Sequence, residues 1–329
     1  MIVERDTDRA TLLFLRDDGT LLGTHTFDSS TSTFTASTTA AGRLWYVASS
    51  DDHLRYLTPD GTFETDLGAL QDLGNGNFIS GLAVRADGKR WAWGVEIAGA
   101  VGPTRTRIDV GGVGVATRVT LEEQATNHVL TPIAWTSQGI LVARDATGIG
   151  GCCYLTPEIA GRDAMLVDPT TLQMTKNWPG CATAAASPEG SFACVTSASR
   201  PARLTVHRTT APDITVTALP PSREVGWALV DDAYNRVVFG AVHSFGNGGS
   251  EGPYAVDTES GDLPGGVVSV LADHATPVAA LPDGRVVVTS APARLSGSTS
   301  TVSVQAPSGA SQQLGPEGAE FVGAFPLPR

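Results

Sequence analysis

Four of the six histidines in this 329-residue chain lie in polar connections between apolar runs: His53, His128, His243 and His274. If folding brings them together, their imidazole nitrogens can hold a transition metal or act as a general base near neutral pH. The alternative is that they are solvated loop residues. We predict no cofactor, and a divalent metal held by these histidines is the alternative. Nearby carboxylates would add ligands or proton-transfer groups, or form a solvated acidic rim: Asp51, Asp52, Glu122, Glu123, Asp145, Glu251 and Asp273.

A second set of candidates is aromatic. We expect Trp178 and Trp227 near the starts of inner strands, and Tyr154 and Phe245 in long loops. A flat apolar ring with a polar rim suits a sugar ring or a peptide side chain, so these residues are candidates for binding. The alternative for both tryptophans is packing inside the fold. Four other tryptophans fall within strands, where packing is expected: Trp45, Trp91, Trp93 and Trp135.

All four cysteines fall within one stretch, at Cys152, Cys153, Cys181 and Cys194. Their spacing fits no common zinc pattern. Clustering also suits pairing, so we expect a disulfide between Cys181 and one of Cys152 or Cys153. Cys194 lies in an apolar run and is read as a small buried side chain. Such a disulfide would place the protein in an oxidising compartment.

The elements that must position these residues recur along the chain. Turns near Gly42, Gly88, Gly139, Gly190, Asn235 and Gly284 each separate two apolar or aromatic runs. The intervals of about 45 to 51 residues are typical of repeated β units. Within each unit, period-two alternation with turn residues between the runs indicates strands, and helix signals are few.

Each unit is interpreted as four strands, and the end fragments look like the parts of one more unit. The sequence therefore predicts an all-β fold, a seven-bladed β-propeller of four-stranded blades, with six blades as the alternative. The split blade would pair both chain ends and remove the open sheet edges. The predicted single domain spans 1–329, with blades at 32–67, 78–121, 128–177, 181–219, 223–271 and 274–314, and with 318–329 plus 1–28 forming the split blade.

Two segments carry a family resemblance, 82–93 (LAVRADGKRWAW) and 185–194 (AASPEGSFAC). They resemble the repeat of TolB-like and WD40-like propellers, in which a strand ends in Ser-Pro-Asp-Gly before a basic residue and an aromatic-rich strand. Only Ser187-Pro188 keeps the Ser-Pro pair, and the Gly-His and Trp-Asp dipeptides typical of WD40 blades are missing. The resemblance implies the fold strongly and the function hardly at all.

Composition limits the classes of partner that the protein can bind. A net charge of -12, from 34 acidic and 22 basic residues, argues against sequence-independent nucleic-acid binding, which needs a basic face. No apolar run is long enough for a membrane span. We expect an extracellular or cell-envelope protein after leader removal, with a cytoplasmic protein as the alternative.

The prediction for function is a non-catalytic binding propeller that recognises a protein or glycan. Its long, Gly-rich connections fall on one face, where loops carry binding, and the short Asp-Gly turns fall on the other. One alternative is a hydrolase or lyase with a metal or His-carboxylate site in the central funnel, and another is a structural or assembly module. No motif specific enough to name a reaction appears, and the sequence leaves the ligand and the oligomeric state open.

Overall fold

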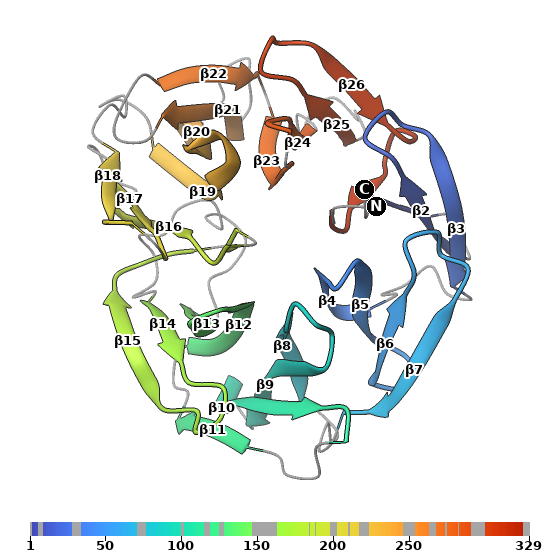
Figure 1. Ribbon diagram of the computed structural model, residues 1–329, viewed down its shortest axis with the longest axis vertical. Helices are drawn as coiled ribbons and strands as arrows, with labels where there is room; N and C mark the ends of the chain where they lie inside the picture. The colour runs from blue at the N-terminus through green and yellow to red at the C-terminus, as the bar shows by residue number, and fades with distance from the viewer. Residues whose placement is uncertain are drawn as a thin grey trace.

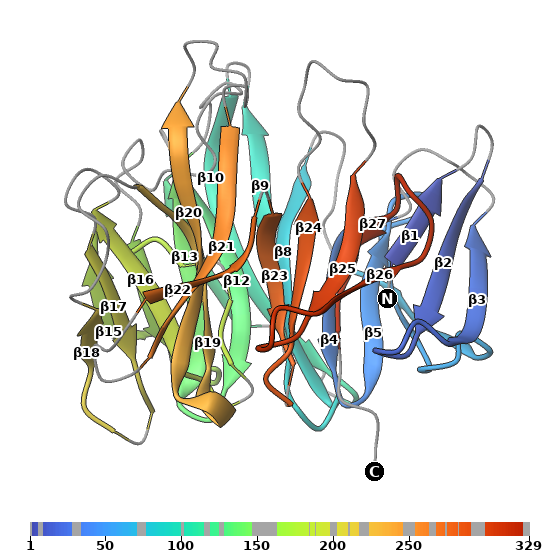
Figure 2. The ribbon, with the colours of Figure 1, turned by 90° about the horizontal axis from the view of Figure 1, so that it is seen from above.

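The fold is described from a computed structural model. The structure describes residues 2–5, 9–27, 34–70, 77–99, 102–114, 119–124, 128–146, 163–183, 185–187, 189–197, 203–209, 211–216, 224–245, 254–262, 268–273, 275–281, 283–290 and 300–324. The strands in these residues form seven sheets, arranged side by side around a ring, which Figure 1 shows face on and Figure 2 from the edge.

One sheet joins the two ends of the chain. Its strands, in spatial order, are β27 (Glu320–Phe321), β1 (Ile2–Arg5), β2 (Ala10–Leu15) and β3 (Leu21–Phe27). Ile2 pairs with Phe321 on one side and with Leu13 on the other, in antiparallel register. The end segments therefore pair in the way that the split unit requires.

The other six sheets are built from consecutive antiparallel strands. Five of them have four strands. Two of these come first in the chain: one has β4 (Phe34–Ala40), β5 (Arg43–Ala48), β6 (His53–Leu57) and β7 (Glu64–Ala69), and the next has β8 (Phe78–Val84), β9 (Arg90–Gly99), β10 (Gly102–Gly112) and β11 (Val119–Gln124). The other three have β12 (His128–Thr136), β13 (Gly139–Ala146), β14 (Asp163–Val167) and β15 (Met174–Pro179); β19 (Glu224–Asp231), β20 (Arg236–Phe245), β21 (Tyr254–Asp262) and β22 (Val268–Ala272); and β23 (Ala275–Ala280), β24 (Val286–Ser290), β25 (Thr301–Gln305) and β26 (Ser311–Leu314). The sixth has β16 (Phe192–Ser197), β17 (Arg203–His207) and β18 (Ile214–Val216).

The core lies between neighbouring sheets, and each sheet-to-sheet contact has its own cluster of buried side chains. Trp45, Trp91 and Trp93, for example, pack between the sheet of β4–β7 and that of β8–β11. The ring closes through Leu13, Leu15 and Phe321, which pack against Val302 and Val304 of the sheet of β23–β26. Some strands bury alternate side chains, as in β2, whereas β5 and β14 lie between two neighbouring sheets and bury almost every residue.

The recurring turns have the backbone that the sequence predicts. At all six positions φ is positive, from 47° at Asn235 to 147° at Gly139. Asn235 follows a 3-10 turn, Asp232–Tyr234, in which the Asp231 carboxylate accepts the Tyr234 N–H. Glycine and asparagine reach this region at low cost, which explains the residue types at the turns. The chain is an all-β propeller, and six of the seven sheets that its described residues form have four strands.

The sheet of β16–β18 departs from that plan at its inner edge. Instead of a regular fourth strand, Ala182 and Ala186 make isolated bridges to Val195 and Phe192 of β16. The turn between Ala186 and β16 is made at Gly190, which has a positive φ and donates its N–H to the Ser187 carbonyl. No helix in the described ranges is long and apolar enough to cross a membrane.

Candidate functional site

A pocket of about 250 Å³ lies where the sheet of β12–β15 meets the sheet of β16–β18. One wall comes from β13, β14 and β15, and the other from β16 and β17. The turns at the ends of these strands complete it. Its lining is Thr136, Gln138, Leu141, Leu166, Lys176, Trp178, Gly190, Phe192, His207, Arg208, Thr209 and Asp213.

Strand register explains why these side chains face the pocket. Trp178 pairs with Ala164, and Lys176 pairs with Leu166. Residues two apart on a strand share a face, so Lys176 and Trp178 both point toward the neighbouring sheet. On that sheet Phe192 and His207 are directly opposite each other across β16 and β17.

Three rings form the apolar part of the pocket. Trp178 and Phe192 meet edge to face, with centroids 4.9 Å apart. The His207 ring lies 5.2 Å from Trp178 and 5.1 Å from Phe192. Its Nδ1 atom is 2.7 Å from Asp213 Oδ2, on the far side of the turn that joins β17 to β18. The histidine ring is therefore held in place by two aromatic neighbours and one carboxylate.

The disulfide lies next to this pocket and corrects the expected pairing. Cys181 is bonded to Cys194, with Cα atoms 4.9 Å apart. Paired N–H···O=C bonds between Ala182 and Val195 bring the two cysteines together, at a separation within the usual range for disulfides. Cys181 is bonded as expected, but its partner is neither Cys152 nor Cys153, which lie outside the described residues. Both bonded cysteines pack in one cluster with Trp178 and Phe192.

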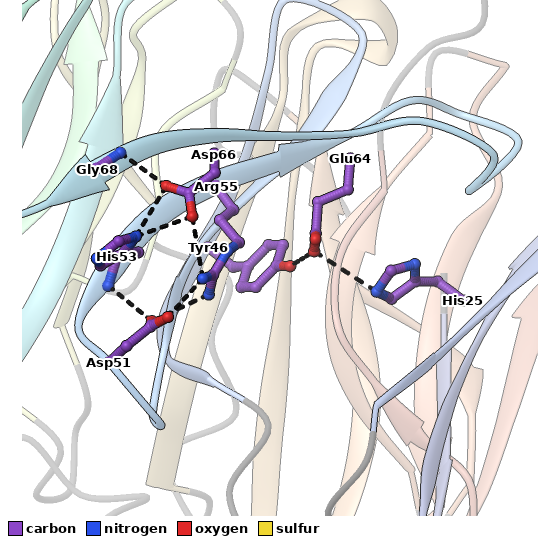
Figure 3. A network of polar contacts seen from close by, with 8 residues as sticks. All are labelled: His25, Tyr46, Asp51, His53, Arg55, Glu64, Asp66 and Gly68. Atoms are coloured by element: carbon purple, nitrogen blue, oxygen red, sulfur yellow. Dashed lines mark hydrogen bonds and ion pairs between the residues drawn. The ribbon is translucent and has the colours of Figure 1, made fainter.

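His53 belongs to a polar network on β6 and β7 (Figure 3). Its Nδ1 atom lies 2.8 Å from Asp66 Oδ2, and Arg55 donates to the same oxygen at 3.1 Å. Arg55 also donates to both oxygens of Asp51, at 3.0 and 2.5 Å. Asp51 in turn accepts the His53 backbone N–H at 3.1 Å, so one arginine and one histidine tie two carboxylates together.

Hydrogen bonds and charges in this network shift the pKa values of Asp51, Asp66 and Arg55. The hydrogen bond from Arg55 lowers the pKa of Asp51 below its usual value. Burial alone would raise the pKa of Asp66, but hydrogen bonds from His53 and the Gly68 N–H, with the Arg55 charge, bring it below the usual value. Arg55 itself has a raised pKa, chiefly through its hydrogen bond to Asp51. Both carboxylates are therefore ionised and already paired.

A second branch of Figure 3 connects two sheets. The Tyr46 hydroxyl of β5 donates to Glu64 Oε1 of β7, and His25 Nε2 of β3 lies 3.5 Å from the same oxygen. Burial lowers the pKa of His25, and the Glu64 charge opposes this only in part. The branch stabilises the contact between the end-joining sheet and its neighbour.

His128 lies in a comparable network at the start of β12. Its Nε2 atom is 3.2 Å from Glu123 Oε2, at the end of β11. Arg144 donates to both oxygens of Glu123, at 3.2 and 2.7 Å, and to Asp163 Oδ2 at 3.2 Å. Burial would lower the pKa of Arg144, but its bonds to Glu123 and Asp163 raise it overall. His53 and His128 thus each sit beside a carboxylate that an arginine also holds.

The other candidate site residues expected from the sequence either lie apart from one another or fall outside the described residues. Asp145 lies on β13 opposite Val129, and Asp273 is exposed after β22. The wholly undescribed candidates are Tyr154, Glu251 and His274, and the side chains of Trp227, His243 and Phe245 also lie outside the described residues. The convergence of histidines is therefore untested. Within the described ranges, no group of three His, Cys, Asp or Glu residues could hold a metal ion.

Trp178 is the sequence candidate that reaches the pocket, although its expected position was wrong. It lies on β15, the outermost strand of its sheet, and not near the start of an inner strand. The expected blade end at 177 cut this strand short, since β15 continues to Pro179. Phe192, His207, Lys176, Arg208 and Asp213 line the pocket but were not singled out from the sequence. The alternation of Lys176 with Trp178 was the available signal for one shared face.

Comparisons with known proteins show the fold and no family. No family model matches the chain, and neither does any curated protein. An acylaminoacyl peptidase from Pyrococcus horikoshii is similar at a TM-score of 0.60 and 10% identity, over 96% of this chain and 50% of that one. The β-propeller domain of the Trilobed protease from Pyrococcus furiosus gives 0.59 and 11%, over 96% and 91%. A putative TolB from Agrobacterium tumefaciens gives 0.41 and 14%, over 77% and 85%.

The two Pyrococcus likenesses, with TM-scores of 0.59 and 0.60, support the resemblance to propellers at the level of the fold. Identities of 10 to 14% carry nothing about activity. The chain spans half the length of the acylaminoacyl peptidase that it matches. The predicted all-β propeller fold is thus confirmed.

Proposed function

We propose that this chain is a binding module, a closed seven-bladed propeller in a single domain, which recognises a protein or a glycan without transforming it. Seven sheets and seven clusters between them support the blade number. The buried Cys181–Cys194 disulfide supports a location outside the cell or in its envelope, since such bonds persist in oxidising compartments.

The observation that carries the binding function is the pocket between β15 and β16–β17. Three rings, from Trp178, Phe192 and His207, give it an apolar surface, and side chains with hydrogen-bonding groups surround them. Small-molecule and side-chain sites combine these two features. Several lining residues, including Gln138, Gly190 and Thr209, come from short turns. The proposed site therefore lies toward the short-turn face, whereas the sequence favoured the long loops.

Removing one ring tests this proposal. Purified protein is applied to arrays of neutral and acidic glycans and of peptides, and any binding is quantified by titration calorimetry. Trp178→Ala should weaken binding roughly tenfold or more, the scale of a central aromatic anchor. Trp135→Ala is the matched control, because Trp135 is also partly buried between sheets but lies outside the pocket. Equal affinity of the wild type and Trp178→Ala for every ligand found would reject the pocket.

A second candidate, a hydrolase or lyase, is favoured by one observation. His207 lines the pocket, and Asp213 holds its Nδ1 atom at 2.7 Å, which is the arrangement of a general base with an orienting carboxylate. Under this reading His207→Gln abolishes turnover of a ligand but leaves its binding within about twofold. Mass spectrometry of ligands after long incubation with the wild type decides between the two. An unchanged ligand supports the binding module.

A further inference from the structure

The geometry points to a specific ligand class for this pocket: a single sugar ring that carries a carboxylate, as in the uronic acid residues of acidic glycans. This inference rests on the proposed binding function and names its ligand. Three observations carry it, which are the pocket's size, its three packed aromatic rings and two positive charges that have no ion-pair partner among the described residues.

The size of the pocket limits the ligand to one ring. Its volume is about 250 Å³. Sites for drug-sized molecules span roughly 300–1,000 Å³, so this pocket is smaller than that class. A longer chain could therefore place only one of its residues inside.

The lining suits a ring with one apolar face and a polar edge. Phe192 is almost fully buried, so its ring supports the others, whereas Trp178 is only partly buried and presents its surface to the pocket. Around these rings stand Gln138, Thr209 and Asp213, whose side chains donate or accept hydrogen bonds. A pyranose meets both requirements at once, because its C–H groups stack on an aromatic ring while its hydroxyls face the polar side chains.

The charges at the pocket select an anion. Lys176 and Arg208 both line it, and neither has an ion-pair partner in the part of the chain that the structure describes. The acidic lining residue, Asp213, is engaged with His207. Elsewhere the chain is acidic, with a net charge of -12 and only one other lysine, Lys89. Two unpaired cations on such a protein create a local potential that favours a carboxylate.

The test compares the same polymers with and without their charge. Polygalacturonate, hyaluronan and alginate are titrated into the protein beside carboxyl-reduced samples of each, in which the carboxylates have become hydroxymethyl groups. At least one native polymer should bind at least tenfold more tightly than its reduced form. That affinity should fall as salt rises from about 50 to 300 mM, since screening weakens attraction between exposed charges.

Two matched pairs of variants assign the discrimination to the pocket. Lys176→Gln and Arg208→Gln should each weaken binding of the native polymer about two- to fivefold, the range for one exposed charge pair, and leave the reduced polymer unaffected. Lys89→Gln and Arg16→Gln remove the same charges at exposed turns outside the pocket, and should change nothing. All four positions are on or near the surface, so unfolding is not expected and is checked by denaturation.

The outcomes separate the ligand class from the binding function. Two results would overturn the carboxylated sugar as the ligand class. One is equal affinity for the native and the reduced polymers. The other is binding of an acidic peptide but of none of the uronate polymers. In either case, a loss of binding in Trp178→Ala would still support the proposal that the chain is a binding module. Absence of binding to all three native polymers also overturns the inference, and the arrays described above then decide the broader proposal.

Discussion

The disulfide between Cys181 and Cys194 supports the same cluster of side chains that forms the pocket wall. Cys194 is two residues from Phe192 on β16, and Cys181 is three residues from Trp178 on β15. Both sulfur-bearing residues are 1% exposed. Cys181 follows the end of β15 at Pro179 and directly precedes Ala182, whereas Cys194 lies on β16. The cross-link therefore joins the irregular inner-edge segment of the sheet of β16–β18 to β16 itself, where the described residues make isolated bridges in place of a strand ladder.

Removing this bond should destabilise the protein by about 3 kcal/mol, the loop-entropy value for a loop of roughly this length. The bond encloses a sequence separation of 13 residues. The measurement is urea denaturation of the wild type with and without reductant, beside a Cys181→Ala/Cys194→Ala double variant. Reductant should lower the stability of the wild type much more than that of the double variant. Alkylation of Cys181 and Cys194 in native, unreduced protein would contradict the bond.

The sheets were predictable because their signals are local. The alternation of apolar and polar residues indicates each strand. A residue that tolerates positive φ marks the turn between two strands, as at Gly88 and Asn235. The pocket was not predictable in this way. It depends on how two sheets pack, which brings Trp178 beside His207 from strands that are not paired. The cysteine pairing expected from the sequence was wrong for the same reason, since the spacing of the cysteines gives no sign of the bridge between Ala182 and Val195.

Closure of the ring predicts that the last described strand contributes to stability. Ending the chain after Gly318 removes β27, with its pairs to Ile2 and Val3, and removes Phe321 from its cluster. The expected loss is at least about 2 kcal/mol, on the scale of burying one aromatic side chain, because buried Ala319 and the hydrogen bond from Thr39 to the Ala324 carbonyl are lost as well. A chain that ends after Ala324 keeps every described contact and is the control. Equal thermal midpoints for both truncations would show that the end pairing does not stabilise the ring.

The lowered pKa of His25 predicts a dependence of stability on pH. Burial disfavours its charged form in the folded state, so the unfolded chain binds the proton more tightly. Stability is then fully present above the unfolded pKa of about 6.5 and falls as pH decreases toward the folded value. Urea midpoints between pH 8 and pH 5 measure this slope. His25→Phe should flatten it.

Glu64 gives a second test of the same site. Its charge raises the pKa of His25 against the effect of burial. Glu64→Gln should therefore lower that pKa further, which NMR titration of the His25 ring measures directly. An unchanged pKa in this variant would mean that the Nε2 contact of 3.5 Å does not couple the two groups.

Gly190 predicts a link between stability and binding. Its φ is +92°, and a Cβ there would lie 3.0 Å from Thr136 Cβ and 3.1 Å from Thr209 Cγ2. Gly190→Ala should cost roughly 1–2 kcal/mol for the left-handed backbone and about 1–3 kcal/mol more for crowding. Thr136 and Thr209 both line the pocket, so their displacement should also weaken ligand binding.

Gly309→Ala separates these two costs. Gly309 has a similar φ of +87°, and a Cβ there would meet nothing within 4 Å. It should therefore lose only the backbone contribution of about 1–2 kcal/mol and keep full affinity. Denaturation and calorimetry on both variants measure the two effects. The contradicting result is that Gly190→Ala loses no more stability than Gly309→Ala and binds as the wild type does. The two sheets would then be in looser contact than the positions of Thr136 and Thr209 indicate, and the pocket could admit more than one ring.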